Sequence, residues 1–195
     1  MIGRSVSAWL LIRAGVRPPS TQTSEEERRC LARHAAGRRR IVEIGVYHGA
    51  NTALLRSVAA ADGEVVGIDP HEPGRLGVSF EHWIAAHQLS RVRGARARLL
   101  RQYSHDAAAT WSAPIDFLFI DGDHSWSGVS RDWSDWTRYL EQGGIVALHD
   151  SRPVDAHPDF DSVRFTREVV QRDARFEMID EVDSLTVLRR RSGSC

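Results

Sequence analysis

The chain alternates short apolar runs, rich in β-branched and aromatic residues, with longer stretches of helical spacing. The strand-like runs are residues 41–45, 65–69, 97–100, 115–120 and 145–148. Such runs are typical of strands buried on both faces, and their alternation with helices favours parallel pairing. The sequence therefore predicts an α/β fold, a Rossmann-like three-layer α/β/α sandwich with helices on both faces of the sheet.

The C-terminal part departs from this alternation. Two strands are expected there, Phe176–Ile179 and Leu185–Leu188, and the link between them is too short to hold a helix. A short link suits an antiparallel hairpin, because parallel neighbours need a crossover of about a dozen residues or more. We therefore expect a mostly parallel seven-stranded sheet with one antiparallel strand near the C-terminus.

Helices are expected between the strands. One begins at a capping box, either Thr23 with Glu26 or Ser24 with Glu27, since S/T-x-x-E marks a helix start. The others are expected at about 49–61, 79–91, 105–111, 128–140 and 163–173, with a helix stop at Gly143–Gly144. The expected organisation is an N-terminal helical cap at 1–37, a main domain at 38–191 and a tail at 192–195.

Charge and composition narrow the class of protein. Lys and Arg number 26, as do Asp and Glu, and this balance argues against a protein that binds nucleic acid through a basic surplus. Apolar runs all fall well short of the roughly 20 residues of a membrane span. We expect a cytoplasmic protein that binds neither nucleic acid nor a membrane. The apolar stretch Trp9–Ile12 predicts a core helix or a homodimer contact.

An E-x-G-x-x-x-G pattern, Glu43, Gly45 and Gly49, lies between the first strand and the helix that follows it. Glycines there let the backbone approach a ligand, and a helix N-terminus offers free N–H groups. Glu43 occupies the place of the first glycine in a dinucleotide fingerprint. A carboxylate would repel a pyrophosphate but would receive an ammonium group such as that of S-adenosylmethionine. Glycines in such turns also occur for packing reasons.

Two further positions suit a nucleoside. Asp69 ends the second strand, where an acid can accept both hydroxyls of a ribose. The alternative for Asp69 is a helix-capping or loop acid. Near the end of the third strand, Gln102 or Ser104 could bond an adenine edge or cap the following helix.

Acidic and histidine residues follow two other strands. Asp121, Asp123 and His124 come after the fourth strand, and His149 and Asp150 come after the fifth. Ligands of parallel sheets bind beyond the carboxyl ends of the strands, so these two groups should face each other there. Converging carboxylates and imidazoles can hold a divalent metal or relay a proton. Asp121, Asp123, His124 and His149 are the expected catalytic residues.

Four segments together, Val42–Thr52, Ile68–Pro70, Phe119–Trp126 and Gly143–Asp150, resemble class I S-adenosylmethionine-dependent methyltransferases. The similar group is the macrocin O-methyltransferase-like one, with relatives of the cephalosporin-hydroxylase type, and D-G-D-H-S is its most specific motif. The resemblance covers about residues 24–190. It implies a small single-domain enzyme, with the main domain as the methyltransferase domain, that methylates a hydroxyl on a sugar or another small natural product.

The same resemblance implies roles for individual residues. S-adenosylmethionine would be the methyl donor, with its amino-acid end near the first glycine motif, its ribose at Asp69 and its adenine near Ser104. The implied cofactor-binding residues are Glu43, Gly45, Gly49, Asn51, Thr52, Asp69, Ser104 and Asp121.

Sugar O-methyltransferases of this group bind magnesium, and the matching positions here are Asp121, His149 and Asp150. His149 stands where the group has an acid, and imidazole suits transition metals better than Mg²⁺. The sequence thus leaves open a divalent metal site or a metal-free mechanism with His124 or His149 as general base. Two other functions also stay open: a non-catalytic protein that binds S-adenosylmethionine, and a nicotinamide-dependent oxidoreductase.

Overall fold

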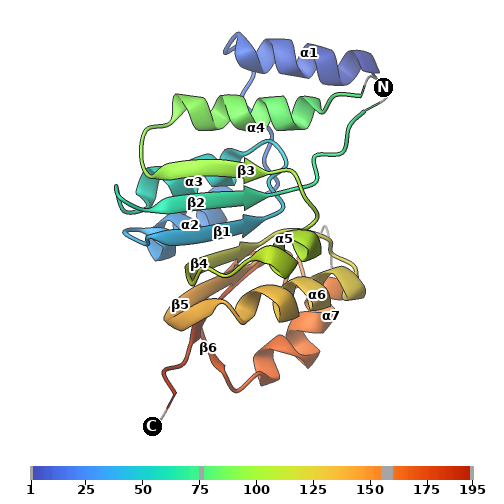
Figure 1. The fold of residues 1–195 in the computed structure, drawn as a ribbon. Coiled ribbons are helices and arrows are strands. Elements are labelled where there is room, and N and C mark those ends of the chain that lie inside the picture. Colours follow the sequence, from blue (N-terminus) through green and yellow to red (C-terminus); the bar gives the residue numbers. More distant parts are fainter. Residues whose placement is uncertain (1, 75–76, 155–159, 194–195) are drawn as a thin grey trace.

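A seven-stranded sheet forms the centre of the computed structural model, which describes residues 2–74, 77–154 and 160–193 (Figure 1). The strand order is β3–β2–β1–β4–β5–β7–β6. The strands are β1 Arg40–Ile44, β2 Glu64–Ile68, β3 Arg96–Leu100, β4 Ile115–Ile120, β5 Leu140–Leu148, β6 Phe176–Val182 and β7 Leu185–Arg190. β1 to β5 pair in parallel, and β7 is antiparallel to both of its neighbours. The predicted Rossmann-like sheet with one antiparallel strand is confirmed.

Helices cover both faces of this sheet (Figure 1). They are α1 Ile2–Arg13, α2 Glu25–Ala35, α3 Ala50–Val58, α4 Phe80–Arg91, α5 Ser104–Thr110, α6 Trp126–Thr137, α7 Asp161–Glu168 and the short 3-10 helix η1 Val170–Arg172. α2 and α3 pack on one face, and α5, α6 and α7 pack on the other. β4 shows why its sequence lacks polar alternation: Phe117 and Phe119 face one helical layer while Leu118 and Ile120 face the other.

The expected stop at Gly143–Gly144 is wrong. α6 ends earlier, at Thr137, and the two glycines lie inside β5. The pairing of β5 with β4 shifts register there, and Gly143 has a positive φ of 74°. A positive φ is easy for glycine and is typical of a β-bulge, so the glycines bend a strand instead of ending a helix.

The N-terminal helix α1 lies on α4, on the side away from the sheet (Figure 1). Trp9 packs edge-on against His87 and tilted against Trp83, and Ile12 is buried. A core contact therefore exists, while the homodimer contact stays a prediction. α2 packs directly on the sheet, and the domain boundary at 37–38 also stays a prediction. Within the described ranges, every helix is too short or too polar to cross a membrane.

Candidate cofactor and active site

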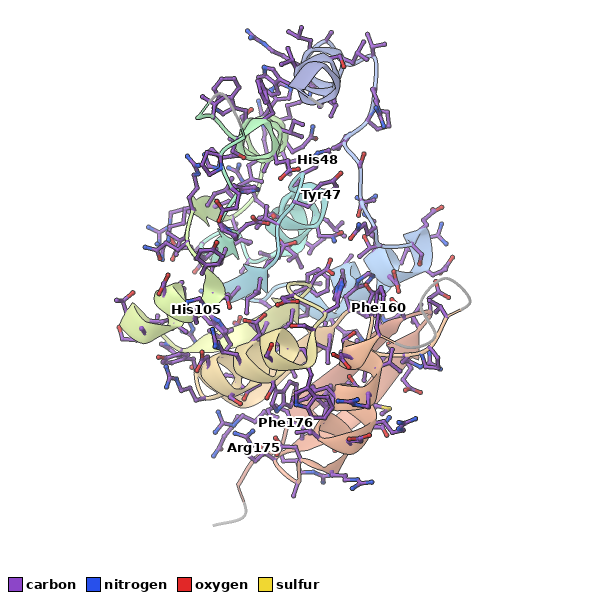
Figure 2. The ribbon with its side chains drawn as sticks, turned by 90° about the vertical axis from the view of Figure 1, so that its right-hand side faces the viewer. Tyr47, His48, His105, Phe160, Arg175 and Phe176 are labelled. Atoms are coloured by element: carbon purple, nitrogen blue, oxygen red, sulfur yellow. The ribbon has the colours of Figure 1, made fainter. Side chains whose placement is uncertain are left out.

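A cavity of about 520 Å³ opens at the carboxyl ends of the parallel strands, within the usual size of a small-molecule site. Figure 2 faces this edge of the sheet, with Tyr47 and His48 above His105, and Phe160 to one side. The cavity is lined by segments 20–22, 44–47, 50–51, 68–70, 103–105 and 121–123, and by Gly128, Arg131 and Asp132 of α6. A cavity therefore lies at the strand ends, where the sequence predicts the binding site.

The glycine loop, residues 45–49, borders this cavity at its first three positions. Gly45 has a φ of 85°, and a Cβ there would lie 1.8 Å from the backbone oxygen of Asp121. Gly49 has a φ of 76° and precedes α3, where a Cβ would lie 2.9 Å from the Cα of Ala85 in α4. Gly45 thus lets β1 approach the end of β4, whereas Gly49 serves helix packing.

Asp69 holds the glycine loop in place. Its Oδ2 accepts hydrogen bonds from the backbone N–H groups of Val46 (2.9 Å) and Tyr47 (3.0 Å), and its Oδ1 accepts one from His71 (2.7 Å). The ring Nε2 of His71 lies 2.9 Å from the carbonyl oxygen of Tyr47. Tyr47 and His71 both have a positive φ, at 49° and 42°. Such conformations persist only where surrounding bonds enforce them, so the loop is shaped without a ligand.

Glu43, Asn51 and Thr52 lie behind the loop. The cavity lining includes Asn51, whose Oδ1 accepts a hydrogen bond from Thr23, but among described residues it includes neither Glu43 nor Thr52. Both oxygens of Glu43 are fully buried without a hydrogen-bond partner in the described ranges, and burial raises the pKa of this carboxyl well above its usual value. The predicted contact of Glu43 with an ammonium group stays a prediction.

Ser104, predicted to lie near an adenine, does line the cavity and donates a hydrogen bond to Oδ1 of Asp132. Sequence reasoning missed Asp132. A signal was present, because Asp132 shares the helical face of Val129, Trp133 and Trp136, all of which are buried. An acid on an apolar helix face is costly to bury and therefore indicates a specific partner.

Four predicted residues meet at the ends of β4 and β5 as an acid–histidine cluster, which consists of Asp121, His124, His149 and Asp150. Their ligand atoms all lie within 4.8 Å of one another. His149 Nδ1 lies 3.0 Å from Asp121 Oδ1 and 3.4 Å from Asp150 Oδ2. His124 Nε2 lies 3.2 Å from Asp150 Oδ2. The prediction that the two strand ends face each other is confirmed.

Glu27 of α2 holds the other side of His149. Its Oε2 lies 3.2 Å from His149 Nε2 and accepts a hydrogen bond from the backbone of Ser24. Its Oε1 accepts bonds from the backbone N–H (2.9 Å) and the hydroxyl (2.6 Å) of Ser184. The sequence indicated a capping box here, and Ser24 with Glu27 forms it. That Glu27 also reaches His149 was not predicted.

The charge of His149 in this cluster is stabilised by the carboxylates around it. Burial alone would lower the pKa of His149, but Asp121, Asp150 and Glu27 raise it to about 12. Burial would raise the pKa of Glu27, but bonds from His149 and Ser184 lower it to about 2. His149 and Glu27 are therefore an imidazolium and a carboxylate side by side at neutral pH.

His124 and Asp123 lie at the outer side of the cluster. The carboxylate of Asp121, 3.7 Å from His124 Nε2, together with the charge of Asp150, raises the pKa of the imidazole, which stacks on Phe160 at 5.3 Å between ring centroids. Asp123 accepts bonds at 2.9 Å from the backbone N–H and the hydroxyl of Ser125, which caps α6. Asp123 borders the cavity, but its carboxylate organises the start of α6.

A family comparison identifies this architecture. The methyltransferase domain family matches residues 42–151, more than half of the chain. The chain belongs to this family. Among individual relatives, tricin synthase 1 of Oryza sativa subsp. japonica is 33% identical over 107 residues, 52% of this chain and 42% of that protein. The chain spans half or less of the length of the curated relatives it matches.

Solved structures share the fold of the methyltransferase domain seen here. Cofactor-bound Rv0187 from MTB aligns with a TM-score of 0.72 and 21% identity over 97% of this chain and 91% of that one. The O-methyltransferase TomG from Streptomyces achromogenes, in complex with SAM, aligns with a TM-score of 0.63 and 18% identity over 96% and 90%. At these identities the likeness establishes the arrangement of the sheet and its helices.

Proposed function

We propose that this protein is an S-adenosylmethionine-dependent methyltransferase that methylates a hydroxyl group on a small molecule, a sugar or another natural product. One observation supports this most: Asp121 belongs both to the cavity beside the glycine loop and to the acid–histidine cluster. A donor bound in the cavity and an acceptor at the cluster would therefore meet at one residue. TomG, which is an O-methyltransferase, shares this fold, and tricin synthase 1 is a curated relative in sequence. Both likenesses support methyl transfer to a hydroxyl group.

The cavity suits each part of the donor. Its lining offers the Asn51 amide near the glycine loop, the Asp69 carboxylate at the end of β2 and the Ser104 hydroxyl at the start of α5. The donor's amino-acid, ribose and adenine parts need polar partners of these kinds. When bound, S-adenosylmethionine supplies a methyl group on positively charged sulfur, and the S–C electron pair returns to sulfur as the new C–O bond forms.

The residues of the cluster would align the acceptor and remove its proton, the two tasks that an activated donor leaves to the protein. We assign the proton acceptor to Asp121 or Asp150, because both carboxylates face the same space between His124 and His149. His149 already has a proton on the side of Glu27, and it suits the role of a cation that balances the carboxylates. This assignment favours Asp121 or Asp150 over His149 as the base.

A divalent metal would be held by Asp121, Asp150 and His149 Nδ1, which would release its proton on binding, with His124 as a fourth ligand. The spacing of these ligand atoms fits one ion. Two imidazoles and two carboxylates suit Mn²⁺, Fe²⁺ or Zn²⁺ better than Mg²⁺. A bound ion would act as a Lewis acid toward the acceptor oxygen.

The first experiment is calorimetric titration of chelator-treated protein with S-adenosylhomocysteine, alone and with Mg²⁺ or Mn²⁺, and with NADH as the comparison ligand. We expect micromolar binding of S-adenosylhomocysteine and none of NADH. Transfer of a labelled methyl group to a panel of sugars and phenols then tests turnover. Failure to bind S-adenosylhomocysteine under every condition would refute the proposal, and donor binding without transfer to any acceptor would favour the non-catalytic alternative.

A further inference from the structure

A second cluster of side chains that can bind a metal lies where α2 meets β6. Cys30 and His34 come from α2 and Asp180 comes from β6, and one ligand atom of each lies within 4.8 Å of the others. His34 follows Cys30 by four positions, a spacing that places both side chains on one face of a helix. These three residues belong neither to the acid–histidine cluster nor to the described lining of the cavity, so the proposed methyl transfer does not use them.

The distances between these ligand atoms suit one tetrahedral ion. Zinc binds sulfur at about 2.3 Å and nitrogen or oxygen at about 2.0 Å, so its sulfur and oxygen ligands lie about 3.5 Å apart and its nitrogen and oxygen ligands about 3.3 Å apart. Cys30 Sγ lies 3.6 Å from Asp180 Oδ2, and His34 Nε2 lies 2.8 Å from the same oxygen. The first pair already has the spacing of two zinc ligands, and the second would separate by about half an ångström.

The types of ligand select among metals. A thiolate is a soft ligand that favours zinc over magnesium or calcium, and imidazole and carboxylate are the other common zinc ligands. A thiolate and a carboxylate together carry two negative charges, which one divalent cation neutralises. Cys30 is buried, whereas His34 and Asp180 are partly exposed, so an ion has a path from solvent and room for a water as its fourth ligand.

Arg33 contacts two of the three ligands and competes with an ion for them. Its Nη2 donates to Asp180 Oδ2 at 2.5 Å and to Cys30 Sγ at 3.7 Å. The Arg33 side chain is largely exposed, and ion pairs of exposed side chains contribute little to stability, so an ion can displace the guanidinium. Burial and the charge of Asp180 raise the pKa of the Cys30 thiol to about 11, so binding must also release the thiol proton to solvent.

We propose that Cys30, His34 and Asp180 bind Zn²⁺ or a similar divalent metal. The ion links α2 to the hairpin of β6 and β7, the same two elements that the hydrogen bonds between Glu27 and Ser184 join. An ion that binds only the folded chain stabilises it by mass action, independently of any methyl transfer.

The experiment is a titration of the reduced, chelator-treated protein with Co²⁺, followed by absorbance. A thiolate bound to Co²⁺ gives a charge-transfer band in the near ultraviolet, which carboxylate and imidazole ligands do not give. We expect this band in the wild type and its loss when Zn²⁺ is added in competition. Cys30→Ser should lose the band, whereas Cys195→Ser, at the other cysteine of the sequence, is the matched control and should keep it.

Arg33→Gln distinguishes a metal site from a contact that is only structural. Loss of the competing guanidinium should tighten Co²⁺ binding by roughly tenfold, because a positive charge near a divalent ion is removed. Arg29→Gln, on the same helix and paired with Glu25 and Glu26 instead of Asp180, is the control and should change the affinity little. Unchanged or weaker binding in Arg33→Gln would overturn the inference.

Thermal unfolding checks that each variant folds, and Zn²⁺ should raise the unfolding temperature of the wild type more than that of Cys30→Ser. A wild type without a thiolate band at saturating Co²⁺ would overturn the inference, and so would a band that Cys30→Ser retains. Co²⁺ bands in the visible region alone would assign the ion to a site without a thiolate, such as the acid–histidine cluster, and would overturn it as well.

Discussion

The two halves of the site are built in opposite ways. The half at the ends of β1 to β3 is shaped by backbone N–H groups that converge on Asp69, and it encloses an open cavity. The half at the ends of β4 and β5 is held by charged side chains, with His149 between Glu27 and Asp121. The first half is preformed for a ligand, whereas in the second half an incoming group must replace partners that the protein already provides.

The largest effect is expected from a substitution in the glycine loop, which disrupts the preformed half of the site. Gly45→Ala places a Cβ 1.8 Å from the backbone oxygen of Asp121 and requires a positive φ, so backbone must move. We expect a loss of roughly 3 kcal/mol in unfolding free energy and loss of S-adenosylhomocysteine binding in calorimetry. Gly143→Ala is the control, because its φ is 74° but nothing lies within 4 Å of its Cβ. Equal effects of the two changes would show that the close approach to β4 is unimportant.

The charged half is tested by Glu27→Gln. The amide keeps the shape of Glu27 but removes one of the carboxylates that raise the pKa of His149, so this pKa should fall. Loss of a buried charged hydrogen bond should cost roughly 1–3 kcal/mol of unfolding free energy. NMR titration of the His149 ring and urea unfolding measure the two effects. Glu26→Gln, at an exposed neighbour paired with Arg29, should change neither, and an unaltered His149 titration in Glu27→Gln would contradict the assigned contact.

The pH dependence of the unfolding free energy, measured on metal-stripped protein, further tests the charged half of the site. The pKa of Glu27 is lowered from 4.5 to about 2, so its contribution is present above pH 4.5 and is lost as the pH falls toward 2. The pKa of His149 is raised from 6.5 to about 12, so its contribution is present below pH 6.5 and is lost as the pH rises toward 12. The wild type should therefore exceed Glu27→Gln in unfolding free energy by the largest amount between pH 4.5 and 6.5, where both contributions are present. Urea unfolding at about pH 3, 5.5 and 9 tests this, and a flat difference would speak against a paired charge.

The smallest effect is expected at Asp123, on the boundary between the halves. Asp123→Asn keeps an oxygen for the backbone N–H of Ser125 but loses the charge and the oxygen that accepts from the Ser125 hydroxyl, so unfolding free energy should fall by about 0.5–1 kcal/mol. Methyl transfer should persist in this variant, whereas Asp121→Asn should abolish it. Abolition in both variants would restore a direct catalytic role to Asp123.

The sheet was predictable because its evidence is local. Apolar runs mark buried strands, and the rule that parallel strands present their carboxyl ends at one edge brought Asp69, Asp121 and His149 together before any coordinates. Local patterns also mislead: Gly143–Gly144 suits a helix stop as well as a bulge. Only the pairing of β5 with β4 distinguishes the two.

The missed residues depend on contacts between distant parts of the chain. Glu27 is separated from His149 by 122 positions, and Ser104 is separated from Asp132 by 28. A capping box indicates a helix start at Glu27, but not that its second oxygen faces another element. Gly49 also has a long-range contact that its motif did not reveal, since it packs against α4, while its expected role at a cofactor stays a prediction.

The bonds between Glu27 and Ser184 join positions 157 residues apart, the start of α2 and the turn between the last two strands. During synthesis the N-terminal side of this pair is made first and must wait for nearly the whole domain. Until the final hairpin docks, Glu27 lacks both donors of Ser184, so one of its two oxygens has no partner from that turn. The support of the reacting half would therefore be completed last on the ribosome, after the elements that form the donor cavity.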